Sequence, residues 1–201
     1  MSENGPPPLI VGISGASGAI LGVRVLDACA ELGVHTHLVV SRAAALTLAQ
    51  ETRLDMAAVS ARATVTYRAA DVGAAIASGS FPTRGMVIAP CSIRTMSEIA
   101  TGVTSSLMTR AADVTLKERR TLVLMVRETP LHLGHLRTMA LLAEMGAVIA
   151  PPMPAFYAGV QSLAEVVDQA VGRALDVLGL AWRPVRRWGV DVGPIAPVAE
   201  D

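Results

Sequence analysis

The fold of this chain depends on residues 11–19, which read Val-Gly-Ile-Ser-Gly-Ala-Ser-Gly-Ala. The apolar run at residues 9–13 predicts a strand, and apolar residues at helical spacing predict a helix at residues 19–32. Between them, a tight turn of glycine and serine brings backbone N–H groups to a helix N-terminus, where the helix dipole favours an anion. The spacing of Gly12, Gly15 and Gly18 fits nucleotide-binding loops only loosely. The turn therefore fits either a nucleotide phosphate or a plain connection between strand and helix.

Further apolar runs alternate with helical patterns along the chain. Strands are predicted at residues 9–13, 34–40, 64–67, 86–89, 122–126 and 147–150. Helices are predicted at residues 19–32, 42–51, 72–77, 95–118, 135–145 and 163–178. Continuous apolar strands between helices imply a parallel sheet with helices on both faces. We therefore expect one α/β domain over residues 1–201, with a doubly wound, Rossmann-like or flavodoxin-like sheet. Its core spans about residues 9–180, and the tail at residues 181–201 is expected in subunit contacts.

The composition narrows the function classes. Hydrophobic residues make up 52% of the chain, charged residues 17%, and the formal net charge is zero. A net charge of zero gives no electrostatic reason to expect binding to nucleic acid or to an anionic membrane. The excess of apolar residues favours a homo-oligomer. With no signal-like start and no run near the roughly 18 apolar residues that span a bilayer, a cytoplasmic location is expected. Cys29 and Cys91 lie in separate predicted elements and do not form a disulfide framework.

Hydroxyl groups and arginines follow several of the predicted strands. In a doubly wound sheet, ligands bind beyond the carboxyl ends of the strands. Ser41 and Ser92 taken singly are plain helix N-caps, but together with Ser17, Arg94 and Arg127 they suit a ligand that carries a phosphate. The segments that follow the strands are residues 14–17, 41, 90–95, 127–130 and 151–157.

Three other features each allow two interpretations. Lys117 is the only lysine of the chain, which suggests a required point charge but also fits a solvated helix end. The aromatic pair Phe156 and Tyr157 lines a site or fills a hydrophobic gap. His132 and His135 lack a third ligand, so a polar turn is favoured over a metal site.

Taken together, several segments resemble the UbiX-like flavin prenyltransferases in order and spacing, from about residue 9 to residue 180. The segments are residues 12–19, 90–92, 110–114, 116–120, 127–130, 146–149 and 154–157. Arg94 departs from the lysine or glycine that relatives often carry. Residues 181–201 match weakly apart from residues 187–189, and the resemblance places Trp188 over the pocket of a neighbouring subunit.

The resemblance implies a transfer reaction rather than a redox reaction. Such proteins join the dimethylallyl group of dimethylallyl phosphate to N5 and C6 of reduced FMN, without a metal. The prenylated FMN then serves UbiD-type decarboxylases. The family is dodecameric, and its sites are shared between subunits.

The resemblance also assigns residues. The FMN-binding residues would be Gly15, Ala16, Ser17, Ser41, Ser92, Ile93, Arg94, Thr95 and Arg127. The donor phosphate would be held by Arg110, Lys117, Tyr157 and Arg173. The catalytic residues would be Ser17, Glu51, Glu128, Lys117 and Tyr157. A cluster of basic side chains would stabilise the charge that develops on the leaving phosphate, and Glu128, Glu51 or the released phosphate would accept a proton.

Three alternatives stand beside this interpretation. The first is a flavin-dependent decarboxylase of the same fold, acting on a cysteine-containing peptide or a pantothenate intermediate. Its Pro-x-Met-Asn-x-x-Met-Trp loop does not match residues 152–157, which read Pro-Met-Pro-Ala-Phe-Tyr. The second is a decarboxylase of aromatic acids, and the third is a non-catalytic carrier that delivers FMN to a partner decarboxylase.

Overall fold

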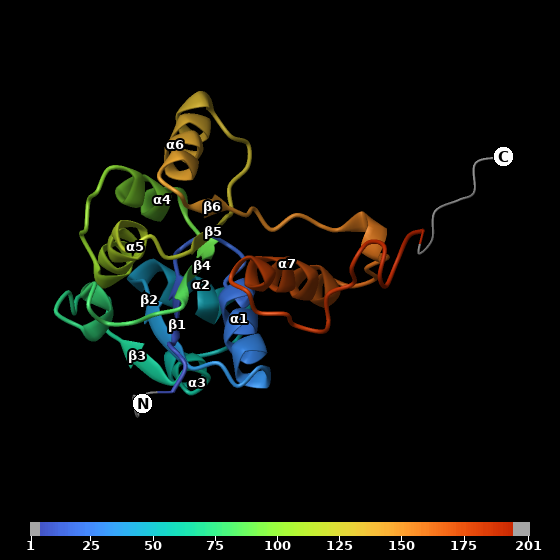
Figure 1. Cartoon of the computed structure of the whole chain (residues 1–201), viewed down its shortest axis with the longest axis horizontal. Helices are drawn as coiled ribbons and strands as arrows, with labels where there is room; N and C mark the ends of the chain where they lie inside the picture. Colours follow the sequence, from blue (N-terminus) through green and yellow to red (C-terminus); the bar gives the residue numbers. More distant parts are fainter. Residues whose placement is uncertain (1–4, 195–201) are drawn as a thin grey trace.

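Six parallel strands form one sheet within residues 5–194, the part of the chain that the computed structural model describes (Figure 1). The strand order is β3-β2-β1-β4-β5-β6, the order of the Rossmann fold, so the predicted doubly wound sheet is confirmed. The order reverses between β1 and β4, which places a ligand-binding crevice beyond their carboxyl ends. The strands are β1 (Leu9–Ile13), β2 (Thr36–Val40), β3 (Val65–Tyr67), β4 (Gly85–Cys91), β5 (Leu122–Val126) and β6 (Val148–Ile149).

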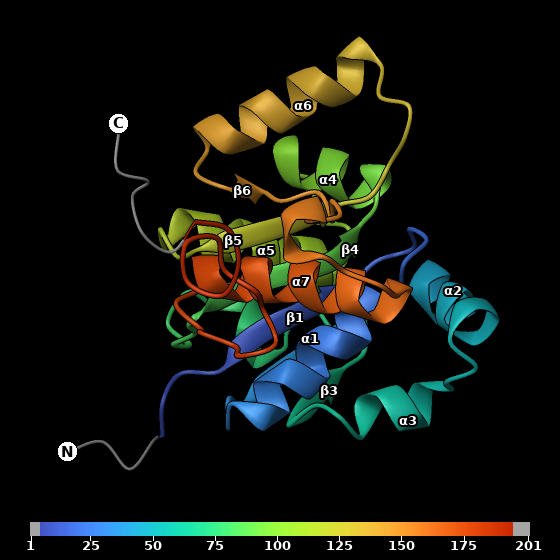
Figure 2. The same cartoon turned by 90° about the vertical axis from the view of Figure 1, so that its right-hand side faces the viewer.

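Helices cover both faces of the sheet. They are α1 (Ile20–Glu31), α2 (Arg42–Glu51), α3 (Met56–Ser60), α4 (Ile93–Ala100), α5 (Leu107–Lys117), α6 (Leu133–Glu144) and α7 (Leu163–Val177). Two short 3-10 helices are η1 (Ala75–Ala77) and η2 (Phe156–Ala158). Leu9, Val11 and Ile13 of β1 pack with α1 and α7, whereas Ile10 packs with α4 and α5 on the opposite face. Figure 1 shows these two layers on either side of the sheet, and Figure 2 shows α6 beyond α4, at one edge of the molecule.

The predicted helix at residues 95–118 is wrong, because the segment forms two helices. α4 ends at Ala100, Gly102 adopts a left-handed backbone with φ +70, and Ser106 caps α5. A glycine just past a helix end and a serine before the next are ordinary stop and start signals. The predicted helix at residues 72–77 is also wrong, because only the 3-10 turn η1 forms there. The short helix α3 was not predicted, although Asp55 caps its first turn.

The core extends past the expected boundary at residue 180. Trp182 and Val185 are buried against α7, and Val185 fills the space that a side chain at Gly172 would occupy. Residues 181–185 therefore belong to the domain. The last part of the expected tail, residues 195–201, lies outside the described residues. Within residues 5–194, no helix combines the length and apolar character needed to cross a membrane.

The close packing of α1 on the sheet gives a stability prediction. An added Cβ at Gly22 would meet the carbonyl oxygen of Ala89 and lie 2.6 Å from Cγ1 of Ile13. We expect Gly22→Ala to lower the free energy of unfolding by about 2 kcal/mol, because backbone and core cannot move aside cheaply. Urea unfolding measures the loss. Gly73→Ala is the control, because its added Cβ would have no neighbour closer than 3.8 Å. Equal stability of the two variants would contradict the packing argument.

Candidate functional site

A pocket of about 530 Å³ opens beyond the carboxyl ends of β1, β2 and β4. It brings together five of the predicted FMN-binding residues, one or more from each of these strand ends. They are Gly15, Ser41, Ser92, Arg94 and Thr95. Close approach is possible because Gly15 has no side chain, since a Cβ there would collide with Cβ of Ala43 at the start of α2.

Three helices begin at this pocket. Ser41 caps α2, Ser92 caps α4 and Ser106 caps α5, and all three serines line the pocket. Each serine hydroxyl accepts a hydrogen bond from the third helical N–H, at 3.1, 3.3 and 3.3 Å. The first two N–H groups of α2 and α4 have no partner within a helix, and the helix dipoles add positive potential. At α5 the Leu107 amide already donates to the carbonyl oxygen of Ala69 at 2.8 Å. The pocket is therefore suited to an anionic group such as a phosphate.

A buried hydroxyl fixes the loops on the two central strands. Ser14 Oγ donates a hydrogen bond to the carbonyl oxygen of Pro90 at 2.8 Å and accepts one from the Ser92 amide at 2.7 Å. Ser14 is fully buried, so its hydroxyl needs both partners. This link sets the position at which Ser92 begins α4.

Glu51 reaches back from the end of α2 to the glycine-rich turn. Its Oε2 accepts hydrogen bonds from the amides of Gly18 (2.8 Å) and Ala19 (3.0 Å). Burial opposes ionisation of Glu51, but hydrogen bonds from Ser17, Gly18 and Ala19 and the charge of Arg127 outweigh it and lower its pKa. A carboxylate of the protein itself therefore occupies the N-terminus of α1. The sequence allowed a nucleotide phosphate at the turn before α1. The N-termini of α2, α4 and α5 are better suited to it.

The same contacts gather three predicted residues beside the pocket. Ser17 hydrogen-bonds to Glu51, and the charge of Arg127 acts on Glu51. Arg127 directly follows β5, and its amide bonds to the carbonyl oxygen of Cys91 at 3.1 Å. Glu128 comes next and is exposed, with Oε1 accepting from the Thr129 amide at 3.0 Å.

A second group lies on η2 and α7. Tyr157 packs edge-on against Trp188, with ring centroids 5.7 Å apart. Arg173 donates from NH1 to Asp176 at 2.7 Å. In the described chain, neither Tyr157 nor Arg173 lines the pocket at the carboxyl edge. Figure 1 shows why, because the segment that follows β6 leaves the sheet and runs out past α7.

Lys117 lies at the opposite edge of the sheet. It ends α5 just before β5 begins, and five residues of strand separate that edge from the pocket by about 16 Å. Its ammonium pairs with Glu118. Arg110 lies further up α5 and pairs with Asp113 at 2.7 Å. The expected cluster of Arg110, Lys117 and Arg173 is therefore not assembled by the described residues of a single copy.

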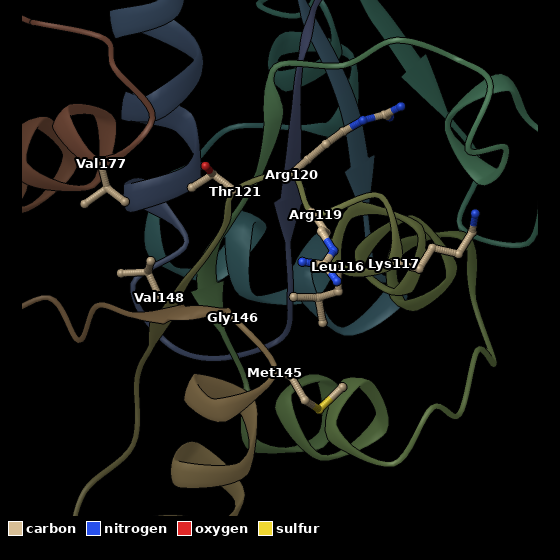
Figure 3. Close-up of a pocket in the computed structure, with 9 residues that line it drawn as sticks. All are labelled: Leu116, Lys117, Arg119, Arg120, Thr121, Met145, Gly146, Val148 and Val177. Atoms are coloured by element: carbon tan, nitrogen blue, oxygen red, sulfur yellow. The ribbon is translucent and has the colours of Figure 1, made fainter.

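A larger cavity of about 770 Å³ lies at this amino edge, between the ends of α5, α6 and α7 (Figure 3). Figure 3 shows Lys117 extending away from Val148 and Val177. Arg120 is engaged elsewhere, because it donates to the carbonyl oxygens of Gly79 (2.7 Å) and Phe81 (2.8 Å). Arg119 also lines the larger cavity, so the smaller pocket is distinguished by the three helix N-termini that begin there and not by its charge.

The remaining predicted residues and the cysteines have simple environments. Ala16 is buried beneath the turn, and Ile93 is the first residue of α4. Burial raises the pKa of the Cys91 thiol to about 12, so this thiol stays protonated at neutral pH. His132 caps α6 through Nδ1. Across residues 5–194, no group of three His, Cys, Asp or Glu side chains is arranged to hold a metal ion.

The sequence interpretation missed the part of the pocket that α5 supplies. Glu98 accepts hydrogen bonds from Arg94 Nε (2.8 Å) and Ser105 Oγ (2.6 Å) and so connects α4 to the loop before α5. The polar lining residues missed are Arg42, Glu98, Ser105, Ser106 and Thr109. Reading Gly102 as a helix stop and Ser106 with Thr109 as a cap would have placed a helix N-terminus there.

A doubly wound sheet with a polar pocket beyond its strand ends is typical of nucleotide-binding proteins, and comparison with known proteins places the chain among the flavoproteins. Residues 1–175 match the family model named Flavoprotein. A relative from Salmonella typhimurium, "Flavin prenyltransferase UbiX", is 60% identical over 169 residues, covering 84% of this chain and 89% of the relative. A relative of the same name from Thauera aromatica is 51% identical over 180 residues, covering 90% and 93%.

Solved structures agree with these matches. AnUbiX, solved in complex with FMN and dimethylallyl pyrophosphate, superposes with a TM-score of 0.89 at 44% identity, covering 90% of this chain and 97% of that chain. A dodecameric FMN-dependent Ubix-like decarboxylase from Escherichia coli O157:H7 gives a TM-score of 0.88 at 46% identity, covering 90% and 98%. The chain therefore belongs to the UbiX-like flavin prenyltransferase family, and the resemblance seen in the sequence is confirmed.

The environment of Glu51 predicts a pH-dependent stability. Because its folded-state pKa lies below the usual 4.5, ionised Glu51 stabilises the fold above pH 4.5, and this contribution is lost as the pH falls through the lowered value. We expect Glu51→Gln to reduce the free energy of unfolding at neutral pH by about 0.5 kcal/mol, as for a charge at a helix N-terminus. Urea unfolding over a pH series should show this deficit shrinking below pH 4.5.

Glu144→Gln is the matched control, because Glu144 is the exposed last residue of α6. Because Glu144 lies at the negative end of the α6 dipole, Glu144→Gln should show no loss of stability at any pH. A deficit in Glu51→Gln that persists unchanged in acid would show that the charge of Glu51 is not the cause.

Proposed function

We propose that this chain transfers the dimethylallyl group of dimethylallyl phosphate to N5 and C6 of reduced FMN. The observation that carries the proposal is the pocket at the carboxyl edge, where three helix N-termini and Arg94 surround space for a phosphate. Family membership supports the same reaction.

The pocket residues fit FMN through their donors. Ser41, Ser92 and Thr95 offer hydroxyl and amide N–H groups, and Arg94 offers a guanidinium, so the phosphate of FMN would be held here. Gly15, Ala16, Ser17, Ile93 and Arg127 line the same edge and would complete the site. Reduced FMN would supply the electron-rich nitrogen and carbon that accept the prenyl group.

The donor phosphate is assigned to Tyr157, Arg173, Arg110 and Lys117. Cleavage of the allylic carbon–oxygen bond leaves negative charge on the phosphate, and fixed cations stabilise that charge. Because Lys117 lies at the amino edge of its own sheet, we assign its contribution to the site of a neighbouring copy.

A homo-oligomer also accounts for the surface of α6. Leu133, Leu136 and Leu141 of this helix are 60%, 49% and 43% exposed, which is costly for a lone chain. A dodecamer like that of the Escherichia coli relative would bury such side chains and bring the basic residues of different copies together.

Proton transfer is assigned to carboxylates at the carboxyl edge. Joining the prenyl group to N5 would release the N5 proton. Bonding it to C6 would require one proton to be added to the prenyl double bond and one to leave C6, and an exposed carboxylate such as Glu128 is suited to these transfers. Glu51, whose pKa is lowered, is ionised at neutral pH and is the second candidate, acting with Ser17. The product, prenylated FMN, would be passed to a UbiD-type decarboxylase.

The decisive experiment is anaerobic incubation with reduced FMN and dimethylallyl phosphate, followed by mass spectrometry of the flavin. We expect FMN to gain one five-carbon unit. Glu128→Gln should slow closure of the ring at C6 about a hundredfold, because the group that transfers the proton is removed. The open N5 adduct and the closed product have equal mass, so the closure is followed by the loss of the prenyl alkene proton in NMR spectra of the flavin. Glu144→Gln should match wild type.

Unmodified FMN, in a protein that binds both ligands, would refute the transferase. It would favour the FMN carrier or a decarboxylase, the activity that the name of the Escherichia coli relative carries.

The sharing of sites is tested by complementation. Lys117→Ala and Arg173→Ala should each be nearly inactive alone. Co-expressed in equal amounts, they should restore about a quarter of the wild-type activity, because random assembly joins an intact Arg173 with an intact Lys117 from another copy at that frequency.

The control pairs Lys117→Ala with a chain that carries both substitutions, which supplies no intact Lys117 and should stay inactive. If the two single variants together also stay inactive, Lys117 and Arg173 do not serve one site from different copies.

A further inference from the structure

One carboxylate on α7 holds two arginines. Asp176 Oδ2 accepts a hydrogen bond from Arg173 NH1 at 2.7 Å, and Arg187 binds both Asp176 oxygens with NH1 and NH2, each at 2.7 Å. The Asp176 side chain is only 16% exposed, whereas that of Arg173 is 58% exposed. A largely buried carboxylate thus holds the guanidinium group of an exposed arginine.

The charges of this group favour an anion. Burial opposes ionisation of Asp176, but hydrogen bonds and charge from Arg187 and Arg173 outweigh it and lower its pKa below the usual 3.8. The two guanidinium groups and the Asp176 carboxylate sum to +1, and the Asp191 carboxylate, whose charge also acts on Arg187, lies beside them. The bond to Asp176 uses only NH1 of Arg173, so its other N–H groups are free to meet a phosphate.

The same carboxylate also determines the position of an aromatic pair. Arg187 is followed directly by Trp188, and the Arg187 amide donates to Asp191 at 2.8 Å, which closes a tight turn around the tryptophan. Trp188 then lies edge-on against Tyr157. Asp176 is therefore connected to Arg173 on one side and, through Arg187 and Trp188, to Tyr157 on the other.

We propose that Asp176 is a positioning residue for the prenyl-phosphate site, holding Arg173 directly and Tyr157 through Arg187 and Trp188. This inference rests on the proposed function, which assigns Arg173 and Tyr157 to the donor phosphate. The structural gain is pre-organisation, since a long arginine side chain loses considerable rotamer freedom when it binds an anion without support.

Asp176→Asn separates positioning from charge. The substitution keeps the shape of the side chain and raises the net charge of the group to +2. If Asp176 acted only through its charge, the donor phosphate would bind more tightly in the variant. If Asp176 positions the arginines, the donor phosphate binds more weakly.

The experiment measures steady-state prenyl transfer by the FMN-loaded protein. We expect Asp176→Asn to raise KM for dimethylallyl phosphate about tenfold, the size expected for one lost charged hydrogen bond, with a smaller change in kcat. The dissociation constant of FMN should not change. The variant Trp188→Phe identifies the part of the near-ultraviolet circular dichroism that comes from Trp188. This part should weaken in Asp176→Asn. Asp176→Glu should recover part of the Trp188 signal and part of the low KM.

The matched control is Asp168→Asn. Asp168 lies on the same helix and accepts hydrogen bonds from Arg24 Nε at 2.6 Å and NH2 at 3.4 Å, but this pair ties α7 to α1. Its KM should equal that of wild type. An unchanged or lower KM in Asp176→Asn, or an equal rise in Asp168→Asn, would overturn the proposal.

Two further measurements cover other outcomes. If Asp176→Asn does not fold, Arg187→Gln replaces it, and an unaltered Trp188 signal with an unaltered KM would refute the positioning role. If wild type transfers no prenyl group, the proposed function fails, but calorimetric titration of the FMN-loaded protein with inorganic phosphate still tests Asp176. The inference would then be refuted if wild type binds no phosphate, or if Asp176→Asn binds phosphate as strongly as wild type does.

Discussion

The candidate site depends on how two central strands are joined at their carboxyl ends. β1 and β4 are neighbours, and beyond them the chain turns toward different helices. The buried Ser14 hydroxyl bridges the Pro90 carbonyl and the Ser92 amide, and a polar group without water must keep both partners. This bond determines where α4 begins, and α2 and α5 complete the pocket around it. A flexible junction here would scatter the three helix N-termini that make the pocket anion-binding.

Three carboxylates beside the proposed sites each hold a polar partner within the chain. Glu51 satisfies the amides at the start of α1, Glu98 holds Arg94, and Asp176 holds Arg173. Ordering a long cationic side chain costs rotamer entropy. An acidic neighbour orders the side chain in the absence of a ligand, so less entropy is lost when a ligand binds. The same pairing reduces the net positive charge of each group. In the proposed shared site, Lys117 or Arg110 of a second copy would raise that positive charge again.

The two phosphate-directed groups occupy separate places on one copy. The pocket belongs to the loops after β1, β2 and β4, whereas Tyr157, Arg173 and Trp188 gather on η2, α7 and the segment after it. The proposed transfer between two phosphate-bearing molecules would need both groups at one site. The exposed apolar side chains of α6 are consistent with the assembly of copies that the proposed function requires.

The sequence by itself determined what is local. Apolar β-rich runs placed the strands, and Ser41 and Ser92 marked helix starts, because a cap acts within three residues of its own position. It missed the break between α4 and α5, where helical spacing on both sides concealed the stop at Gly102 and the start at Ser106. Only the tertiary structure brought Glu51 to Gly18 across 33 residues, joined Asp176 to Arg187, and placed Lys117 at the far edge of the sheet. These contacts depend on strand order and helix direction, and no local pattern of side chains encodes either.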